Sequence, residues 1–512
     1  MMNWNFDLTY TRLPDAFFAR VGPIPVAAPT VVLLNRGLAV EMGLDPMALQ
    51  DSGVAPLLGG NRRDSSSEPI AQAYAGHQFG HFTLLGDGRA HLLGEHVAPD
   101  GSRVDVQLKG SGPTPYSRRG DGRAALGPML REYLISEAMR GLGIPTTRSL
   151  AVVATGEPVF REEALPGAIL TRIAASHIRV GTFEYAAALD AGLDVPGHPG
   201  FAAEKGQRDR SSRQPPEYVR ALADYTIWRH YPTLSDRPAR YVDLLNAVIE
   251  RQAILIAEWM RVGFVHGVMN TDNMTLSGET IDYGPCAFVD HYDPATVFSS
   301  IDRQGRYAFA NQARIGQWNL ARFAETLLPL LDPDPKAALG IAEEAIGRFP
   351  ALFAAQWQSA MRSKLGLIHE HADDVDLIES LLQWMQRSGA DYTNTFRDLG
   401  SHAAIETPSL VNAGFDDPEF MVWHQRWNKR LMGQGVDIDA AILRMRAVNP
   451  AVIPRNHRVE QALAAVVEKG DLEPAHRLLD VLADPYDGRH DDSEYRRPPL
   501  PEQRVHQTFC GT

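Results

Sequence analysis

Apolar residues follow two different spacings along the chain, and the change of spacing separates two kinds of structure. Between residues 72 and 172, short apolar runs are broken by glycine and proline, which is typical of strands and tight turns. In the run 104–108, valine and leucine alternate with polar residues, so we expect Lys109 on the opposite face of the strand. A turn at 99–101 predicts pairing with the preceding strand, and apolar runs at 152–153, 159–160 and 168–172 extend the predicted sheet.

Apolar residues at helical spacing predict helices in other parts of the chain. One helix covers 127–141, where Gly143 and Pro145 stop it, and a longer one covers 241–260 and ends at Gly263. Further helices are predicted at 33–42, 311–331, 335–348, 374–388 and 457–483. The polar segments 204–216 and 484–504 predict a mobile loop and a tail with little order.

The composition fits a globular protein of two or more lobes. The chain has 512 residues, of which 44% are hydrophobic and 22% are charged. The net charge of −13 argues against general binding to nucleic acid or to an anionic membrane. Two cysteines make neither a disulfide framework nor a zinc site. We see no signal peptide and no apolar run of ~18–20 residues, so we expect a cytoplasmic protein and, by default, a monomer.

A glycine pair marks the first candidate ligand site. Gly86-Asp87-Gly88-Arg89 lies between the apolar runs 82–85 and 90–95, which predicts a hairpin with a glycine turn. Glycine lets backbone N–H groups approach phosphate oxygens. A kinase carries its phosphate-contacting lysine on the strand after such a hairpin, where this chain has Lys109. An ordinary tight turn and a solvated lysine are the alternatives, and no P-loop motif is present.

Arginines gather in two further segments. Residues 111–123 hold three arginines and Asp121 among glycines that include Gly122, and such a sequence cannot form regular structure. Arg172 and Arg179 flank a predicted strand end. Guanidinium groups suit bidentate phosphate contacts, so both segments are candidate phosphate clamps, although surface arginines are the alternative for the second.

The stretch from His266 to Asn273, followed by Asp282-Tyr283-Gly284, resembles the catalytic and metal-binding segments of protein kinases. The kinase pattern places a catalytic aspartate where this chain has Val268, which cannot accept a proton. Asn273 and Asp282 occupy the metal-ligand positions, and Asp272 is the one carboxylate of the loop. The sequence therefore predicts a metal–nucleotide site that is used differently from that of an ordinary kinase.

Two glutamates of the predicted helix 127–141 are candidates for an ion pair with Lys109. Helical periodicity places Glu137 on the apolar face and so favours it over Glu132. Either residue could instead lie on a solvated face.

Over essentially its whole length, the chain resembles the selenoprotein O (YdiU) family of protein nucleotidyltransferases, in a form without selenocysteine. The resemblance rests on motifs at 86–89, 107–112, 117–123, 143–148, 266–274 and 282–285. It implies an α+β, protein-kinase-like bilobal fold, with a β-rich N-lobe and a helical C-lobe. The segments expected are an N-terminal extension (1–60), the N-lobe (61–175), the C-lobe with the catalytic loop (176–400) and a C-terminal helical extension with a flexible tail (401–512).

The family's activity is the transfer of AMP, or of UMP, from ATP or UTP to Ser, Thr or Tyr hydroxyls of proteins. The resemblance makes Asp272 the base, Asn273 and Asp282 the ligands of Mg²⁺ or Mn²⁺, and Glu132, rather than Glu137, the partner of Lys109. The alternative role for Asp272 is to support the side chain of Asn273. The residues that it assigns to nucleotide binding are Gly86, Gly88, Arg89, Lys109, Asp121, Gly122, Arg172, Arg179 and Asp282. A kinase and an ATP-binding pseudokinase scaffold are the alternative functions.

The two cysteines form a candidate redox pair. Cys286 lies four residues after Asp282, and Cys510 lies near the C-terminus, where some relatives carry selenocysteine or cysteine. A bond between them would hold the tail over the site and make activity redox-dependent. Two unrelated thiols are the alternative.

Overall fold

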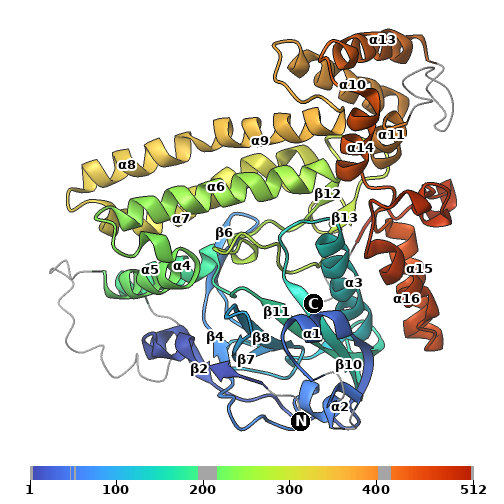
Figure 1. The fold of residues 1–512 in the computed structure, drawn as a ribbon. Helices are drawn as coiled ribbons and strands as arrows, with labels where there is room; N and C mark the ends of the chain where they lie inside the picture. Colours follow the sequence, from blue (N-terminus) through green and yellow to red (C-terminus); the bar gives the residue numbers. More distant parts are fainter. Residues whose placement is uncertain (1–3, 46–47, 51–52, 194–215, 402–416, 509–512) are drawn as a thin grey trace.

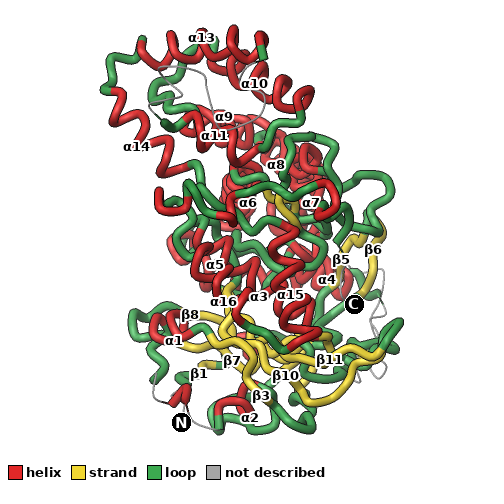
Figure 2. The backbone as a smooth tube through the Cα atoms, turned by 90° about the vertical axis from the view of Figure 1, so that its right-hand side faces the viewer, coloured by secondary structure: helices red, strands yellow, loops and turns green. Residues whose placement is uncertain are grey.

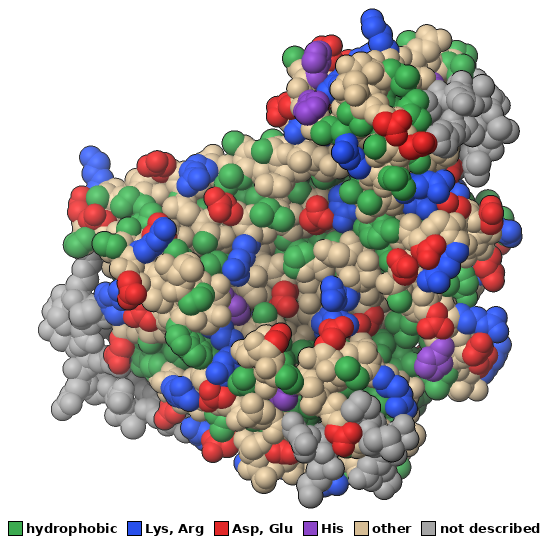
Figure 3. Space-filling view, in the orientation of Figure 1, with side chains coloured by type: hydrophobic (Ala, Val, Ile, Leu, Met, Phe, Trp, Pro, Cys, Tyr) green, Lys and Arg blue, Asp and Glu red, His purple; other side chains and the backbone are tan. Residues whose placement is uncertain are grey.

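The computed structural model describes residues 4–45, 48–50, 53–193, 216–401 and 417–508. A sheet-rich part lies at the bottom of Figure 1 and a helix-rich part at the top. Acidic and basic side chains are mixed over the face shown in Figure 3, and neither sign forms a continuous field there. Within the described ranges, no helix combines the length and the hydropathy needed to cross a bilayer.

One nine-stranded antiparallel sheet forms the sheet-rich part. Its order is β2-β4-β7-β8-β11-β10-β3, with β1 beside β7 and β9 beside β11. A separate small sheet pairs β5 with β6, and another pairs β12 with β13. The strands are β1 (Phe6–Asp7), β2 (Phe18–Arg20), β3 (Thr30–Leu34), β4 (Ile70–Gln72), β5 (Ala75–Gln78), β6 (His81–Leu84), β7 (Ala90–Val97), β8 (Arg103–Lys109), β9 (Ala124–Ala125), β10 (Arg148–Phe160), β11 (Ala164–Ala174), β12 (Phe264–Val265) and β13 (Ala287–Phe288).

The two faces of β8 lead to two different environments. Val106 and Leu108 pack into a core with the short helices α1 (Arg36–Glu41) and α2 (Val54–Leu58) on the outer face. Lys109 lies on the opposite face, as its alternation with Leu108 predicts, toward α3 (Leu126–Gly141). The pairing of β8 with β7 across the turn near residue 100 is also confirmed.

The helix-rich part is arranged around the long helix α6 (Arg240–Arg261). α7 (Gln312–Leu331) and α9 (Phe349–Lys364) pack along it, and α15 (Asn456–Lys469) returns to pack against α3 (Figure 2). The other helices are α4 (Val180–Asp190), α5 (Glu217–His230), α8 (Pro335–Gly347), α10 (Asp374–Ser388), α11 (Tyr392–Leu399), α13 (Pro418–Met432), α14 (Ile438–Val448) and α16 (Glu473–Leu482).

Several elements differ from the sequence predictions. The predicted hairpin around Gly86 is wrong, because β6 pairs with β5 while β7 pairs with β4, β8 and β1. The residues around Gly86 therefore connect two sheets. The helix expected at 33–42 begins only at Arg36, since Leu33 belongs to β3, and the helix expected at 457–483 is divided at Gly470, which has a φ of +67°.

The tail was expected to have little order, and this prediction is wrong for residues 484–504. Arg496 is buried and forms an ion pair with Asp398 on α11. The segment contains short 3₁₀ turns at 488–490, 494–496 and 501–503. A buried guanidinium paired with a carboxylate orders a segment that its composition alone would leave solvated. The loop predicted at 204–216 lies, except for Pro216, outside the described residues.

Candidate active site

A cavity of about 270 Å³ lies between the sheet and the loops that follow α6. Its wall combines β8, β11, α3 and the segment 268–285. The predicted site residues among its lining are Gly88, Arg89, Lys109, Glu132, Arg172, Arg179, Asp272, Asn273 and Asp282. Residues from sequence positions almost 200 apart therefore meet in one cavity.

The strand register brings the cationic side chains of the sheet together. Arg172 on β11 lies opposite Gln107 on β8, and Lys109 lies two residues further along β8. Because side chains two apart on a strand share a face, these three residues point to the same side of the sheet. That side is the one that α3 covers, so Glu132 can reach both cations.

Four charged groups, which we call the cavity cluster, form the centre of the site: Lys109, Glu132, Arg172 and Asp282. Lys109 Nζ lies 2.7 Å from Glu132 Oε2 and 2.6 Å from Asp282 Oδ1. Arg172 Nε donates to Glu132 Oε1 at 2.8 Å, and its Nη2 also contacts Asp282. Burial raises the pKa of Asp282, but Arg172 and Lys109 outweigh it and hold this pKa well below its ordinary value. The same two cations lower the pKa of Glu132 against the effect of burial, so both carboxylates are ionised, and Glu132 is the glutamate that pairs with Lys109.

Asp282 has an unusual backbone conformation for its residue type. Its φ is +62°, in the left-handed region that L-residues rarely adopt. The carbonyl of Asp282 accepts a bond from Gly284 N at 2.9 Å, and the buried ring of His266 donates from Nε2 to the carbonyl of Ile281 at 3.0 Å. His266 thus holds the segment that carries Asp282.

Asp272 is enclosed by glycines. A Cβ on Gly76 would lie 2.2 Å from Asp272 Oδ1, and one on Gly181 would lie 2.0 Å from the carbonyl of Ala75. These two positions therefore admit only glycine if β5 is to pack against the loop. Asp272 is 8% exposed, and burial raises its pKa to about 7. Within the described residues its Oδ1 has no hydrogen-bond partner.

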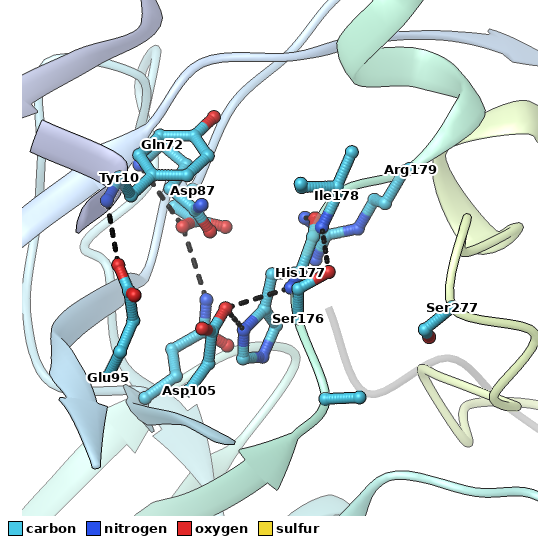
Figure 4. A network of polar contacts seen from close by, with 12 residues as sticks. Tyr10, Gln72, Asp87, Glu95, Asp105, Ser176, His177, Ile178, Arg179 and Ser277 are labelled. Carbon is cyan, nitrogen blue, oxygen red and sulfur yellow. Dashed lines mark hydrogen bonds and ion pairs between the residues drawn. The ribbon is translucent and has the colours of Figure 1, made fainter. Parts of the chain in front are cut away.

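Arg179 is held in place from two directions. Its guanidinium lies 4.4 Å from the ring centre of Tyr74, and Nη1 donates to the carbonyl of His177 at 3.0 Å. His177 is itself fixed by Asp105, which accepts from its backbone N at 2.9 Å (Figure 4). Arg179 Nη2 lies 3.8 Å from Asp282 Oδ2, and Arg179 Nε has no partner among the described residues.

Sequence reasoning missed one buried carboxylate of the cavity wall, Asp87. It accepts hydrogen bonds from Gln72 N and from Gln107 Nε2, both at 3.2 Å. Burial raises its pKa, against the opposing effect of Arg179. The sequence could have identified Asp87, because it lies between Gly86 and Gly88. The two glycines were interpreted only as a turn, and the carboxylate between them was given no role.

Three predicted nucleotide-binding residues do not line the cavity. Gly86, with a φ of +131°, packs against the ring of Tyr116. Asp121 pairs with Arg161 at 2.8 Å, and Gly122 packs against the backbone of the 112–113 segment. None of the arginines in 111–123 lines the cavity either.

Two further predicted residues have other surroundings. Glu137, the glutamate that periodicity favoured, pairs with Arg148 at 2.8 Å instead of Lys109. Cys286 is fully buried, and its carbonyl accepts from Arg131 at 2.7 Å. Cys510 lies outside the described residues, so the redox pair stays a prediction.

The oxygen donors of the site suit a hard divalent cation. Asn273 Nδ2 donates to the carbonyl of Val268 at 2.9 Å, which leaves the side-chain oxygen of Asn273 as an available ligand atom. Asp282 adds carboxylate oxygens in the same cavity wall. Carboxylate and amide oxygens are the ligands that Mg²⁺ and Mn²⁺ prefer. The residues present therefore fit such an ion, with the remaining ligands coming from water and phosphate.

Cationic side chains, a carboxylate of raised pKa and oxygen ligands for a metal all face one cavity, which is typical of a nucleotide-dependent transferase. The profile of the family described as "Protein adenylyltransferase SelO" matches residues 1–192 and 207–483. The chain therefore belongs to this family.

Similar proteins cover the chain almost end to end. "Protein nucleotidyltransferase YdiU" of Nitrosococcus oceani is 55% identical over 511 residues, which are 100% of this chain and 98% of that protein. The proteins of the same name from Geobacillus kaustophilus and Halalkalibacterium halodurans are each 56% identical. They cover 99% and 100% of this chain, and 99% and 98% of their own length.

Proposed function

We propose that the protein transfers AMP from ATP, or UMP from UTP, to Ser, Thr or Tyr hydroxyls of target proteins and releases pyrophosphate. The observation that carries the proposal is the pairing, in one cavity, of Asp272 with the cations Arg89, Lys109, Arg172 and Arg179. A γ-phosphoryl transferase of the kinase pattern would need a carboxylate where Val268 stands. Membership of the family supports the same reaction.

The cations serve to hold the triphosphate. Lys109 and Arg172 now neutralise Glu132 and Asp282, and Arg179 lines the same cavity with its Nη2 3.8 Å from Asp282 Oδ2. Phosphate oxygens accept the same charge-assisted hydrogen bonds that the carboxylates accept here. When the triphosphate binds, Lys109 and Arg172 can divide their donors between phosphate and Glu132, which keeps both side chains extended into the cavity.

Asn273 and Asp282 would hold a divalent ion, which supplies charge stabilisation at the phosphate oxygens when it is bound. Lys109 stands 2.6 Å from Asp282 Oδ1, so it also limits which carboxylate oxygen remains free for that ion. Asp282 Oδ2 faces only Arg179, at 3.8 Å, among its ion-pair partners in the described residues.

Asp272 would act as the base. In its ionised form it accepts the proton of the acceptor hydroxyl while that oxygen forms a bond to the α-phosphorus. The bond between the α-phosphorus and the bridging oxygen breaks at the same time, and its electron pair leaves with pyrophosphate. Burial suits this role, because it raises the pKa of Asp272 to about 7 and a base works best when its pKa lies near the working pH.

The proposed architecture is the bilobal kinase-like one, with the β-rich lobe at 61–175 and the helical lobe at 176–400. A strand lysine paired with a glutamate of the first long helix, and an Asp-x-Gly segment facing both, are shared with the kinase site. In such an arrangement the cavity between the lobes is the nucleotide site, which is where the cavity cluster lies.

The test is incubation of the protein with a generic acceptor protein, divalent metal and ATP labelled at either the α- or the γ-phosphate. We expect label on protein from α only, and loss of that label in Asp282→Asn. Label from γ would establish a kinase instead. Bound ATP with no label from either position would favour a pseudokinase scaffold.

A further inference from the structure

The small β5–β6 sheet is tied to the mouth of the cavity. Phe79 N, at its turn, donates to Asn270 Oδ1 at 3.1 Å, and Tyr307 OH donates to the same oxygen at 2.5 Å. Asn270 lines the cavity, two residues before the proposed base. Phe79 and Gly80 both have positive φ, of +51° and +88°, so the turn is held in a defined shape. Whatever binds over this turn is therefore next to Asp272.

Beside this turn lies a surface that we call the aromatic–arginine patch: Phe82, Arg306, Trp318 and Arg322. The Arg306 guanidinium lies 4.8 Å from the ring centre of Trp318, and that of Arg322 lies 5.1 Å from it. Phe82 is 44% exposed. His77 joins the two aromatic rings, with its ring centre 5.4 Å from that of Phe82 and 5.3 Å from that of Trp318.

Arg306 carries an uncompensated charge. No carboxylate of the described residues lies within ion-pair distance of Arg306, whose guanidinium lies over the rings of Tyr307 and Trp318 instead. Asp302, the acidic residue closest in sequence, accepts from the backbone N–H groups of Arg306 and Tyr307 at 3.0 and 2.8 Å. Arg322, by contrast, is paired with Glu325 at 2.5 Å. A cation pre-oriented over an indole ring is suited to a carboxylate partner, because little side-chain freedom remains to be lost on binding.

We propose that the aromatic–arginine patch binds an acidic segment of the acceptor protein, with Arg306 as its main contact, and thereby places a nearby hydroxyl at Asp272. The inference rests on the proposed function and deepens it, since it names the chemical class of the acceptor. The net charge of −13 repels acidic partners in general, so an acidic segment is expected to bind only where a local cation such as Arg306 receives it.

The experiment uses two random copolymers, one of Glu and Tyr and one of Lys and Tyr. Both are incubated with the full chain, divalent metal and ATP labelled at the α-phosphate, and binding of each fluorescein-labelled copolymer is measured separately by anisotropy. The variant is Arg306→Glu. The matched control is Arg36→Glu, because Arg36 is exposed on α1, away from the patch, and the net charge changes equally.

We expect the unmodified chain to bind and label the Glu–Tyr copolymer better, with a KM about fivefold lower than for the Lys–Tyr copolymer, and salt to weaken the preference. Arg306→Glu should remove or invert the preference with little change in kcat, and Arg36→Glu should leave it unchanged. Equal KM values for both copolymers, or a preference that survives in Arg306→Glu, would overturn the inference.

The binding arm separates this inference from the proposed function. If no acceptor is labelled but the Glu–Tyr copolymer still binds in an Arg306-dependent way, the proposed function fails and the patch stands as an acidic-partner surface. If label is transferred without any charge preference, the inference fails and the proposed function stands.

Discussion

Two buried clusters of charge lie within the same part of the molecule, and they differ in what surrounds them. The cavity cluster lines a cavity. A second group, which we call the sealed cluster, comprises Glu95, Asp105, His177 and Arg229 and does not line that cavity (Figure 4 shows three of its members). Arg229 lies 2.9 Å from Glu95 and 2.7 Å from Asp105, and its side chain is 3% exposed.

The two clusters differ in how many partners their carboxylate oxygens have. In the sealed cluster, Glu95 also accepts from Tyr10 N at 2.7 Å, and Asp105 accepts from His177 N at 2.9 Å, so the carboxylates are well occupied. In the cavity cluster, two cations crowd one oxygen of Asp282 while Asp272 Oδ1, nearby, has no partner in the described residues. Burial alone therefore does not mark a functional site, because both clusters are buried and only the cavity cluster lines this cavity.

The largest expected effect is on catalysis. Asp272→Asn should lower the rate of nucleotidyl transfer by about 10²–10⁴-fold, because the amide cannot accept the hydroxyl proton. The melting temperature and ATP binding should stay close to those of the unmodified chain. Asp293→Asn, an exposed change of the same type, serves as the control. Full activity in Asp272→Asn would remove this residue from the proposed mechanism.

The next effect belongs to the sealed cluster and is on stability. Arg229→Met should destabilise the fold by about 3–5 kcal/mol, since it removes the cation that Glu95 and Asp105 share and leaves Glu95 only Arg103, at 3.2 Å. Denaturant unfolding measures it, and transfer activity per folded molecule should persist. Arg240→Met breaks a partly exposed pair with Asp224 and should cost about 1 kcal/mol or less. Equal costs for the two variants would show that the sealed cluster adds no more than a surface pair.

A smaller effect concerns thermal stabilisation by ATP, which should differ between variants of the cavity cluster and variants of the sealed cluster. Glu132→Gln leaves Lys109 and Arg172 short of one negative charge and should destabilise the free protein by about 1–3 kcal/mol. Bound ATP can supply the missing charge, so thermal stabilisation by ATP should be larger than in the unmodified chain. The same measurement on Arg229→Met should show no enhanced response, and an enhanced response there would contradict the distinction.

The smallest effect is on the pH dependence of stability, and it comes from Glu279, which lies beside the sealed cluster. Burial raises the pKa of Glu279 from 4.5 to about 7, although Ala175 N donates to its carboxylate at 2.9 Å. The folded state therefore keeps a proton that the unfolded chain releases, and stability falls as pH rises from 4.5 to about 7. Glu279→Gln should reduce the fall in the free energy of unfolding between pH 4.5 and about 7 by about 1 kcal/mol, after allowance for the partial exposure of the side chain. An unchanged slope in unfolding measured across this pH range would disprove the assignment.

The sequence predicted most of the regular elements, because periodicity is strong where one face is buried. The strand ending at Lys109 and the helix after it were located to within a residue or two. Periodicity failed for the choice between Glu132 and Glu137. Most residues of α3 are buried, so its apolar face does not point to a single side. The strand register, which no local pattern encodes, decides that Glu132 reaches Lys109 and Arg172.

The misses in the site arise from contacts between distant segments. The separate β5–β6 sheet could not be foreseen, since its residues look like half of a hairpin around Gly86. Its packing on the catalytic loop depends on Gly76 and Gly181, which fit around Asp272 and β5 only in three dimensions. The order of the tail depends likewise on Asp398, almost a hundred residues before Arg496.

The left-handed backbone at Asp282 determines how an inactive form of this protein should be made. A replacement with a branched or bulky side chain would add conformational strain to the loss of the carboxylate, and a reduced signal would then mix misfolding with lost chemistry. Asparagine tolerates this region of backbone space and keeps the size of the side chain. Asp282→Asn is therefore the form to use for trapping bound nucleotide, and a β-branched substitution is the form to avoid.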